Sequence, residues 1–330
     1  MTQTGTAGRR GPAKFGVEPF DVGYGASFAA EADSPLDLEC ELVEDDGALA
    51  AHIPQPRQRP DRLAFVDGTM RTDARLTRMG ADGIVYTGLA GSWAVGAALA
   101  DGERSLTVEE VTAERVAIFC GGVPATLPPQ PGGWSWVADA VEPNDLSIAR
   151  QRLQRRMRDA EGELAEQLCT DGWSTVVDGP LNNIRRTRAV PIIGYVKTHH
   201  RRLLDPVNWA RVPQLVAGQR SSAFALGDDL YSCYLRVGDA GPWASPWAGI
   251  VRLEVPAGAG RPAAVAALDA ASSWLPRYAS ALHRDKRAPV NLTPIAGLEG
   301  ALRRRTGDAR LALRAVRGAI TQLNTTGGAS

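Results

Sequence analysis

Two aspartates in this chain stand directly before a glycine at the end of an apolar run. Asp67 follows the run at residues 63–66, and Asp178 follows a β-branched run at residues 174–177. Each run predicts a buried β-strand, and each Asp-Gly pair predicts a tight turn that presents the carboxylate at the strand end. We therefore expect the two carboxylates to meet at one site. The competing interpretation is that each Asp-Gly pair is only a turn.

A third acid on an intervening helix is expected to complete this set. Glu161 lies seventeen residues before Asp178, and Glu163 and Glu166 are alternatives on the same helix. Converging carboxylates repel one another, so such a site is stable only when cations neutralise it. Hard oxygen ligands suit Mg²⁺ or Mn²⁺, and the favoured chemistry is hydrolysis of a phosphodiester by two metal ions. Rival acids, if the helix is assigned wrongly, are Asp73, Glu109, Glu110 and Glu114.

Several other chemistries are excluded by missing motifs. The chain has no Gly-x-x-x-x-Gly-Lys-Ser/Thr loop, no strand-Gly-x-Gly-x-x-Gly-helix unit and no Gly-x-Ser-x-Gly elbow. These absences argue against nucleotide-driven motors, Rossmann dehydrogenases and serine hydrolases of the elbow type.

Composition is that of an ordinary globular protein. The 330 residues are 44% hydrophobic and 22% charged, with 37 basic and 37 acidic side chains. A zero net charge does not itself favour nucleic acid, so an anionic partner would be met by local basic clusters such as residues 150–158 and 303–305. Four scattered cysteines indicate reduced thiols and a cytoplasmic location. No run of about 18 apolar residues predicts a membrane span.

The elements that position the acids follow from hydrophobic patterning. Strands are expected at 62–66, 72–79, 83–91 and 116–120 as an antiparallel set, and 121–145 reads as a long loop. A helix is expected from Asn144 or Asp145 to about 168. Further strands are expected at 173–177, 190–196, 230–237 and 248–256, and helices at 262–284, 293–304 and 308–323.

This order predicts an α/β fold: a mixed sheet with flanking helices and a helical C-terminal segment. It is compatible with an RNase H-like fold, in which the first and fourth strands lie side by side and carry catalytic acids. Three parts are expected. Residues 1–60 form an N-terminal extension, partly flexible; residues 61–256 form the core; and residues 257–330 form the helical C-terminal segment.

The chain resembles the NurA family of DNA-end-processing nucleases over residues 62–290. Phe65-Val-Asp-Gly-Thr69 is similar to the family's first Val-Asp-Gly-Ser block, and Val177-Asp-Gly-Pro-Leu181 to its second Asp-Gly block. Three further blocks correspond to a helical Arg-x-x-Glu, a Gly-x-x-Lys segment and a C-terminal Tyr-Pro…His block; they are Arg158-Asp-Ala-Glu161, Ile193-Gly-Tyr-Val-Lys197 and Leu275-Pro-Arg-Tyr-Ala-Ser-Ala-Leu-His283.

The resemblance implies a manganese-dependent site on an RNase H-like fold. Its ligands would be Asp67, Glu161 and Asp178, with His283 from the C-terminal segment as a further ligand or proton carrier. It also implies a 5′-to-3′ exonuclease that processes DNA ends in double-strand break repair, with single-strand endonuclease activity as an optional second activity. The expected partners are a second copy of the chain and a hexameric HerA-type ATPase translocase.

One position departs from the family pattern. The family's tyrosine in the C-terminal block is Leu275 here, and Tyr278 lies one helical turn further on. An apolar residue cannot bind a phosphate or a water, so a catalytically weak or inactive DNA-end-binding scaffold is the alternative function. An enzyme specialised for RNA is a third.

Basic residues near the acids are expected to contact the substrate. Lys197 is predicted to neutralise a phosphate as a point charge, and Arg71 and Arg201 are predicted substrate contacts. For each of them the competing interpretation is a solvated charge.

Overall fold

The structure is a computed structural model, and it describes residues 40–45, 47–79, 83–102, 106–181, 192–199, 201–281 and 288–327. The elements before the first long helix are strands: β1 (Cys40–Leu42), β2 (Ala51–His52), β3 (Arg62–Met79), β4 (Val85–Asp101), β5 (Thr107–Cys120) and β6 (Val137–Val141). Then come α1 (Leu146–Thr170), β7 (Ser174–Asp178), β8 (Ile192–Val196), α2 (Pro206–Trp209), β9 (Arg220–Ser221), β10 (Phe224–Leu226), β11 (Leu230–Arg236), β12 (Ile250–Pro256), α3 (Arg261–Trp274), α4 (Thr293–Thr306) and α5 (Ala309–Gly327).

The strands form one mixed sheet flanked by helices, which confirms the predicted α/β class. The strand order is β1-β10-β11-β12-β8-β7-β3-β4-β5-β6; β9 also pairs with β11, and β2 pairs with β9. β3, β4 and β5 pair antiparallel, as expected. β7 lies parallel to β3, and β8 lies parallel to β7, so β3 and the first strand after α1 are neighbours.

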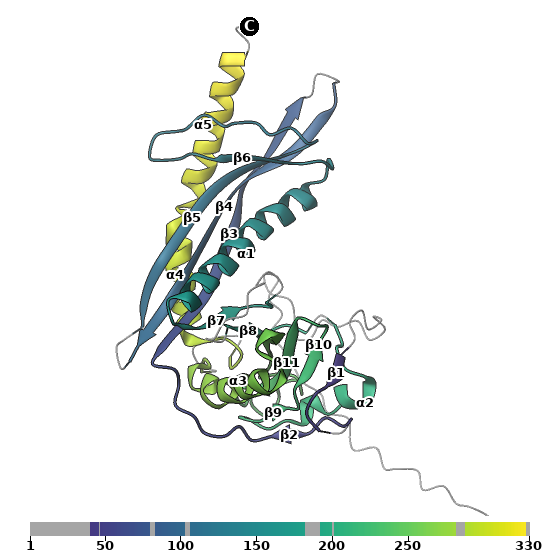
Figure 1. The fold of residues 1–330 in the computed structure, drawn as a ribbon. Helices are drawn as coiled ribbons and strands as arrows, with labels where there is room; N and C mark the ends of the chain where they lie inside the picture. The colour runs from purple at the N-terminus through teal and green to yellow at the C-terminus, as the bar shows by residue number, and fades with distance from the viewer. Residues whose placement is uncertain are drawn as a thin grey trace, which may run out of the picture.

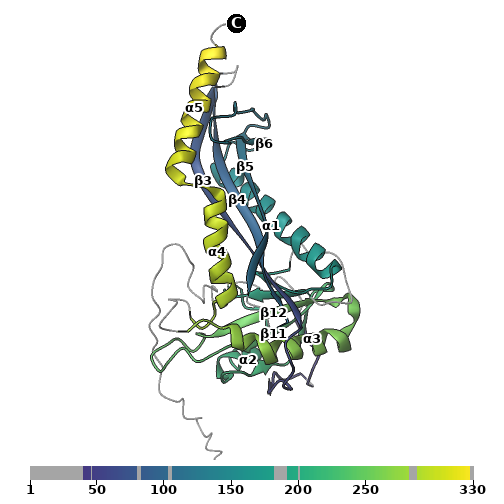
Figure 2. The same ribbon diagram turned by 90° about the vertical axis from the view of Figure 1, so that its left-hand side faces the viewer.

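The long strands build an arm that projects from a rounder body. In Figure 1 the body contains β7, β8, β10–β12 and α3, and the far halves of β3, β4 and β5 rise out of it. Figure 2 shows α1 on one face of this arm and α4 and α5 on the other. Body and arm share β3, because its first residues pair with β7 and its whole length pairs with β4.

The expected turn after Asp67 is wrong. β3 continues through Gly68 without interruption and pairs with β4 from Arg62 to Met79, with a single register shift between Thr72 and Ala74. The runs expected as two strands are therefore one, because every residue after Asp67 still has a partner strand beside it. β6 likewise lies inside the stretch expected as a long loop and pairs parallel with β5.

The helices agree with the sequence pattern with one exception. Asp145 caps α1 by accepting a hydrogen bond from the Ser147 backbone N–H at 2.7 Å, as predicted. α3 ends at Trp274, earlier than expected, and the chain continues as a 3₁₀ turn over Leu275–Tyr278. Pro276 has no backbone N–H and so cannot donate to the carbonyl four residues earlier, which explains why the α-helical hydrogen bonding stops here. Among the described residues no helix combines the length and the apolarity needed to cross a membrane.

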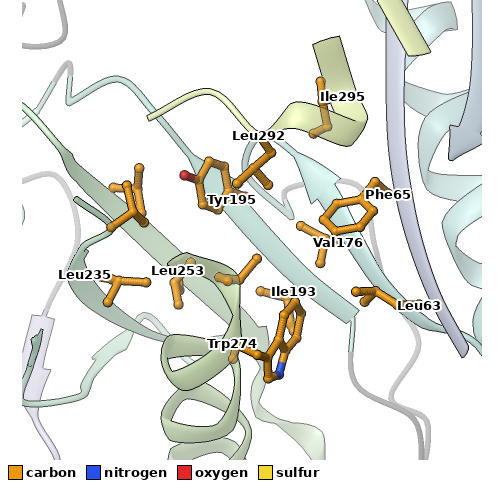
Figure 3. Packing of buried hydrophobic residues seen from close by; sticks show 14 of the residues in the cluster. Leu63, Phe65, Val176, Ile193, Tyr195, Leu235, Leu253, Trp274, Leu292 and Ile295 are labelled. Carbon is orange, nitrogen blue, oxygen red and sulfur yellow. The ribbon is translucent and has the colours of Figure 1, made fainter. Parts of the chain in front are cut away.

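Two hydrophobic cores lie on opposite faces of the sheet, because successive side chains of a strand point to opposite faces. Leu63 and Phe65 pack with α3, α4 and the C-terminal segment, as Figure 3 shows around Trp274, Leu292 and Ile295. Ala64 and Val66 pack with α1 on the other face. By the same alternation Asp67 lies on the Phe65 face.

Candidate active site

The predicted acids meet where β3 and β7 part. Val66 and Val177 form the last parallel pair between these strands, and Asp67 and Asp178 follow them directly. Neighbouring strands lie about 4.8 Å apart, so the two aspartates occupy equivalent positions side by side. Asp178 also shares a face with Val176, which belongs to the same core as Phe65. Both carboxylates therefore emerge on the α3–α4 face.

Glu161 approaches the same point from the α1 face. It lies in the buried stripe of α1, four residues after Met157 and four before Ala165, and only 7% of it is exposed. Its carboxylate accepts a hydrogen bond from the Gly68 backbone N–H. A Cβ added at Gly68 would overlap with this carboxylate. Gly68 is thus needed for the close approach of an acid, where the sequence indicated a turn.

The second Asp-Gly pair is a turn, as predicted. Gly179 has a φ of +139°, a conformation that favours glycine. Its N–H lies 3.0 Å from the carbonyl oxygens of both Val177 and Tyr195. The turn stops β7 at Asp178 and leaves that carboxylate at the strand end.

Lys197 supplies the positive charge of the site. It follows β8, the neighbour of β7, and its Nζ lies 2.5 Å from Asp178 Oδ2. The same ammonium donates to Asn291 Oδ1 at 3.1 Å. Both ion-pair partners are largely buried, with 13% and 11% of their side chains exposed. Lys197 therefore lies in the acid set itself, and its predicted contact with a phosphate stays a prediction.

The other two acids, Asp67 and Glu161, are buried beside further carboxylates, and the pKa of each is raised. Burial, the carboxylates of Asp178 and Glu161 and a smaller effect of Glu299 raise the pKa of Asp67 well above its usual value, against the lowering effect of Lys197. Burial raises the pKa of Glu161 to about 7; Arg158 opposes the rise and Asp178 adds to it. One lysine does not neutralise this group of acids.

Two contributors were missed from the sequence. Glu299, on α4, is half-buried, pairs with Arg303 at 3.1 Å and raises the pKa of Asp67. Asn291 precedes α4 and holds Lys197. Glu299 could have been noticed in the sequence, because it is the one acid of a helix that otherwise carries only arginines as charged residues, and it adjoins the buried Leu298. Asn291 had no such signal.

The rival acids have other partners. The Asp73 carboxylate bonds Arg71 Nε at 2.7 Å and accepts from Ser92 Oγ. Glu114 accepts from Arg156 Nη2 at 2.9 Å and from Trp93 Nε1 at 3.1 Å. These acids belong to the arm, beyond the point where β3 and β7 part. Glu109 is exposed and accepts from the Thr107 hydroxyl, and Glu163 is exposed on α1. The side chain of Glu110 lies outside the described residues.

The other residues predicted to contact the substrate or a metal are not grouped at the acids in the described part of the chain. Besides its bond to Asp73, Arg71 donates to the Gly307 carbonyl at 2.9 Å, which ties β3 to the α4–α5 link. Arg201 is exposed in the body. His283 lies outside the described residues, so its predicted role stays a prediction. Glu166 is half-buried on α1.

Leu275 is a core residue. It is fully buried in the core on the α3–α4 face. Tyr278 follows it in the 3₁₀ turn, and its ring packs edge-on against Phe65 with centroids 4.9 Å apart. Burial raises the pKa of the Tyr278 hydroxyl, against the effects of Arg59 and Arg277. Tyr278 therefore lies on the same face of the sheet as Asp67, although the position that matches the family's tyrosine is Leu275.

The acids fit a divalent cation in donor type and in charge. Carboxylate oxygens are hard ligands, and the raised pKa values of Asp67 and Glu161 report the repulsion that a cation would relieve. In the described part of the chain, however, no three His, Cys, Asp or Glu side chains are already arranged as a metal site. One oxygen of Asp178 is taken by Lys197.

The chain was compared with known families, curated proteins and solved structures. No family model matches the chain. No curated protein matches its sequence either. Among solved structures, it is similar to the crystal structure of the NurA nuclease from Sulfolobus solfataricus, with a TM-score of 0.45 and 10% sequence identity over 83% of this chain and 87% of that one. The function is accordingly argued from the residues of the site.

Proposed function

We propose that this protein is a divalent-metal-dependent nuclease that hydrolyses phosphodiester bonds of DNA. The observation that carries the proposal is the placing of Asp67 and Asp178 at equivalent positions on adjacent parallel strands, with the Glu161 carboxylate against Gly68. Three acids that interact with one another in a largely buried region are costly for the fold. Groups with strongly perturbed pKa values that share one place are candidates for catalysis.

The residues have separable roles. Asp67, Asp178 and Glu161 would hold Mn²⁺ or Mg²⁺, two ions in the simplest arrangement, and the bound metal supplies an activated water and stabilises the leaving oxygen. Lys197 orients Asp178 through its 2.5 Å bond and is itself held by Asn291. Its ammonium then stands beside the place where a phosphate would lie. His283 is the proposed further ligand or proton carrier.

The strand order supports an RNase H-like core. β5, β4 and β3 form an antiparallel set, and β7 and β8 continue it in parallel with β3. In this proposal the first strand is β3 and the fourth is β7, and each contributes one aspartate.

The finer features rest on the sequence blocks that resemble NurA nucleases. They are action on DNA ends with 5′-to-3′ polarity, a role in double-strand break repair, a homodimer and a HerA-type ATPase partner in the cytoplasm. The lack of a phosphate-binding loop in this chain agrees with a separate motor.

A cleavage assay tests the proposal. End-labelled linear duplex DNA is incubated with MnCl₂ and the wild-type protein, Asp67→Asn, Asp178→Asn or Glu163→Gln. Glu163 is an exposed acid two residues from Glu161 and serves as the matched control. We expect cleavage by the wild type and Glu163→Gln, its loss in both aspartate variants and its loss in EDTA. Cleavage that persists in Asp67→Asn would refute the proposed site, and faster degradation of RNA would change the substrate.

A non-catalytic DNA-end-binding scaffold is the second candidate. The fully buried Leu275 and the pairing of Asp178 with Lys197 favour it, because both reduce the groups available to a substrate or a metal. DNA binding by the wild type without cleavage in Mn²⁺ or Mg²⁺ would select this function.

A further inference from the structure

An exposed row of arginines follows one face of α5. Arg310, Arg314 and Arg317 are spaced four and three residues apart, so they lie above one another on the same side of the helix, and all three are exposed. We refer to these three residues as the arginine row. Thr321 and Asn324 continue the same face, and they too are exposed.

The orientation of α5 is held by the core on its other side. Ala312, Val316 and Ala319 are buried against side chains of the arm that include Leu76, Phe119, Trp134 and Trp136. These buried positions stand two residues after each arginine of the row, which is about 200° around the helix. The arginine row therefore points away from the protein.

The positive charge of this region is not balanced locally. Residues 303–327 contain six arginines and one acid, in a chain with zero net charge. The acid, Asp308, accepts hydrogen bonds from the backbone N–H groups of Arg310 and Leu311 and so caps α5. Within the described residues the arginine row takes part in no ion pair, whereas Arg303 pairs with Glu299.

The composition of the surface favours phosphates over bases. Residues 293–327 contain no Phe, Tyr or Trp, so the helices offer no ring on which an unpaired base could stack. The arginine row spans eight residues, about 10 Å of helix, and duplex DNA carries one phosphate charge per about 1.7 Å of its axis. The helix presents its three arginines in a line that can face this dense line of charge.

The row also lies on the helix that directly follows α4, the helix that reaches the acids. α4 and α5 follow one another along the same face of the arm in Figures 1 and 2, and α4 carries Glu299, which acts on Asp67. The geometry points to a docking surface for the phosphate backbone of duplex DNA along Arg310, Arg314 and Arg317. This inference rests on the proposed function and adds the surface that guides the duplex toward the acids.

Binding measured without metal tests the inference separately from catalysis. Fluorescence anisotropy in EDTA compares the wild type with Arg310→Gln/Arg314→Gln/Arg317→Gln on a 30-base-pair duplex over a range of NaCl concentrations. The control, Arg57→Gln/Arg75→Gln/Arg261→Gln, removes three exposed arginines from separate parts of the chain and makes the same change in net charge. Circular dichroism checks that both variants are folded.

We expect the row variant to bind at least tenfold more weakly at moderate salt, with the slope of log K against log [NaCl] shallower by roughly 2 to 3, and the control to change little. Equal weakening in both variants, or none in the row variant, would overturn the inference. So would unchanged DNA binding with lost binding to phosphatidylserine vesicles, which would assign the row to a membrane surface. Asp67→Asn should bind DNA normally, so a failed nuclease proposal and a failed docking surface give different results.

Discussion

Two buried charged clusters in this protein differ in their balance. The acid cluster, Asp67, Glu161, Asp178 and Lys197, contains three carboxylates and one ammonium. The arginine cluster, Arg220, Glu44 and Asp269, lies in the body and contains one guanidinium between two acids. Each cluster joins elements far apart in the sequence, but only the second satisfies the charges it buries.

The arginine cluster is closely hydrogen-bonded. Arg220 Nη1 lies 2.7 Å from Glu44 Oε2, and Arg220 Nε lies 2.9 Å from Asp269 Oδ1. The Ala223 backbone N–H donates to Glu44 at 2.7 Å. Burial would raise the pKa of the Glu44 carboxyl, but the bonds from Arg220 and Ala223 hold that pKa below its usual value. The cluster fastens the segment after β1 to β9 and α3.

The comparison shows how a buried charged cluster that stabilises the fold differs from one that is a candidate for catalysis. Where each charge has partners, as at Arg220, the acid is stabilised as an anion, and the cluster holds the fold together. Where a buried acid has other acids beside it and shares a single lysine with them, as at Asp67, its pKa rises, and the fold bears a cost that only another cation would offset. The following predictions test this difference, from the largest effect to the smallest.

The largest effect is expected at Asp67. Asp67→Asn should lower the rate of DNA cleavage by roughly 10³-fold or more, a barrier increase of about 4 kcal/mol. It should not lower the free energy of unfolding at pH 8, because the substitution removes a buried charge from among like charges. Cleavage kinetics and urea unfolding measure the two effects. If Asp67→Asn also lowers the free energy of unfolding by several kcal/mol, its loss of activity follows from unfolding, and Asp67 is a structural residue.

Arg220 should behave in the opposite way. Arg220→Met should destabilise the protein by about 3 to 5 kcal/mol, because Glu44 and Asp269 lose their buried partner. Urea unfolding at pH 7 measures this, and Arg220→Lys, which retains the charge but loses the forked geometry, should cost less. If Arg220→Met unfolds like the wild type, the arginine cluster does not hold the fold together.

Glu161 should make stability depend on pH. Its folded pKa, about 7, lies above the ordinary value of 4.5, so the folded state holds a proton that the unfolded state has released. Stability from this group is therefore present below pH 4.5 and is lost as the pH rises to about 7, a change of about 3 kcal/mol. Glu161→Gln should unfold at higher temperature than the wild type at pH 8 in EDTA and at a similar temperature at pH 4.5.

A metal titration extends the same experiment. Mn²⁺ at pH 8 should raise the melting temperature of the wild type more than that of Glu161→Gln, because binding to the folded state stabilises it. An equal rise in both proteins would remove Glu161 from the proposed ligands.

The smallest effect is expected at an exposed pair beside the arginine cluster. His52 Nε2 lies 2.7 Å from Asp45 Oδ2, and about a third of each side chain is exposed. His52→Gln should cost less than about 1 kcal/mol, because solvent screens the pair. A cost close to that of Arg220→Met would show that distance alone, and not burial, decides the contribution of these charges.

Much of the architecture could be predicted from local patterns. Apolar runs located β7, β8, β11 and β12, a period of 3.6 residues located α1, and Asp145 was recognised as its cap. These features depend on residues near one another in the chain. The adjacency of Asp67 and Asp178 was also expected, because both follow buried runs. The length of β3 was not, since it depends on pairing with β4 along all of its residues.

The amino-acid sequence by itself determined which acids stand at the ends of apolar runs and which residues can form helices and strands. The tertiary structure decided what each of them does. In the folded protein, Gly68 and Gly179 are glycines for different physical reasons: a side chain at position 68 would overlap with the Glu161 carboxylate, and position 179 has a positive φ. It also placed Lys197, Asn291 and Glu299 around the two aspartates, and bound Asp73 and Glu114 to arginines of the arm. Apart from the Asp73–Arg71 pair, these contacts join residues tens to hundreds of positions apart, and no local pattern in the chain carries that information.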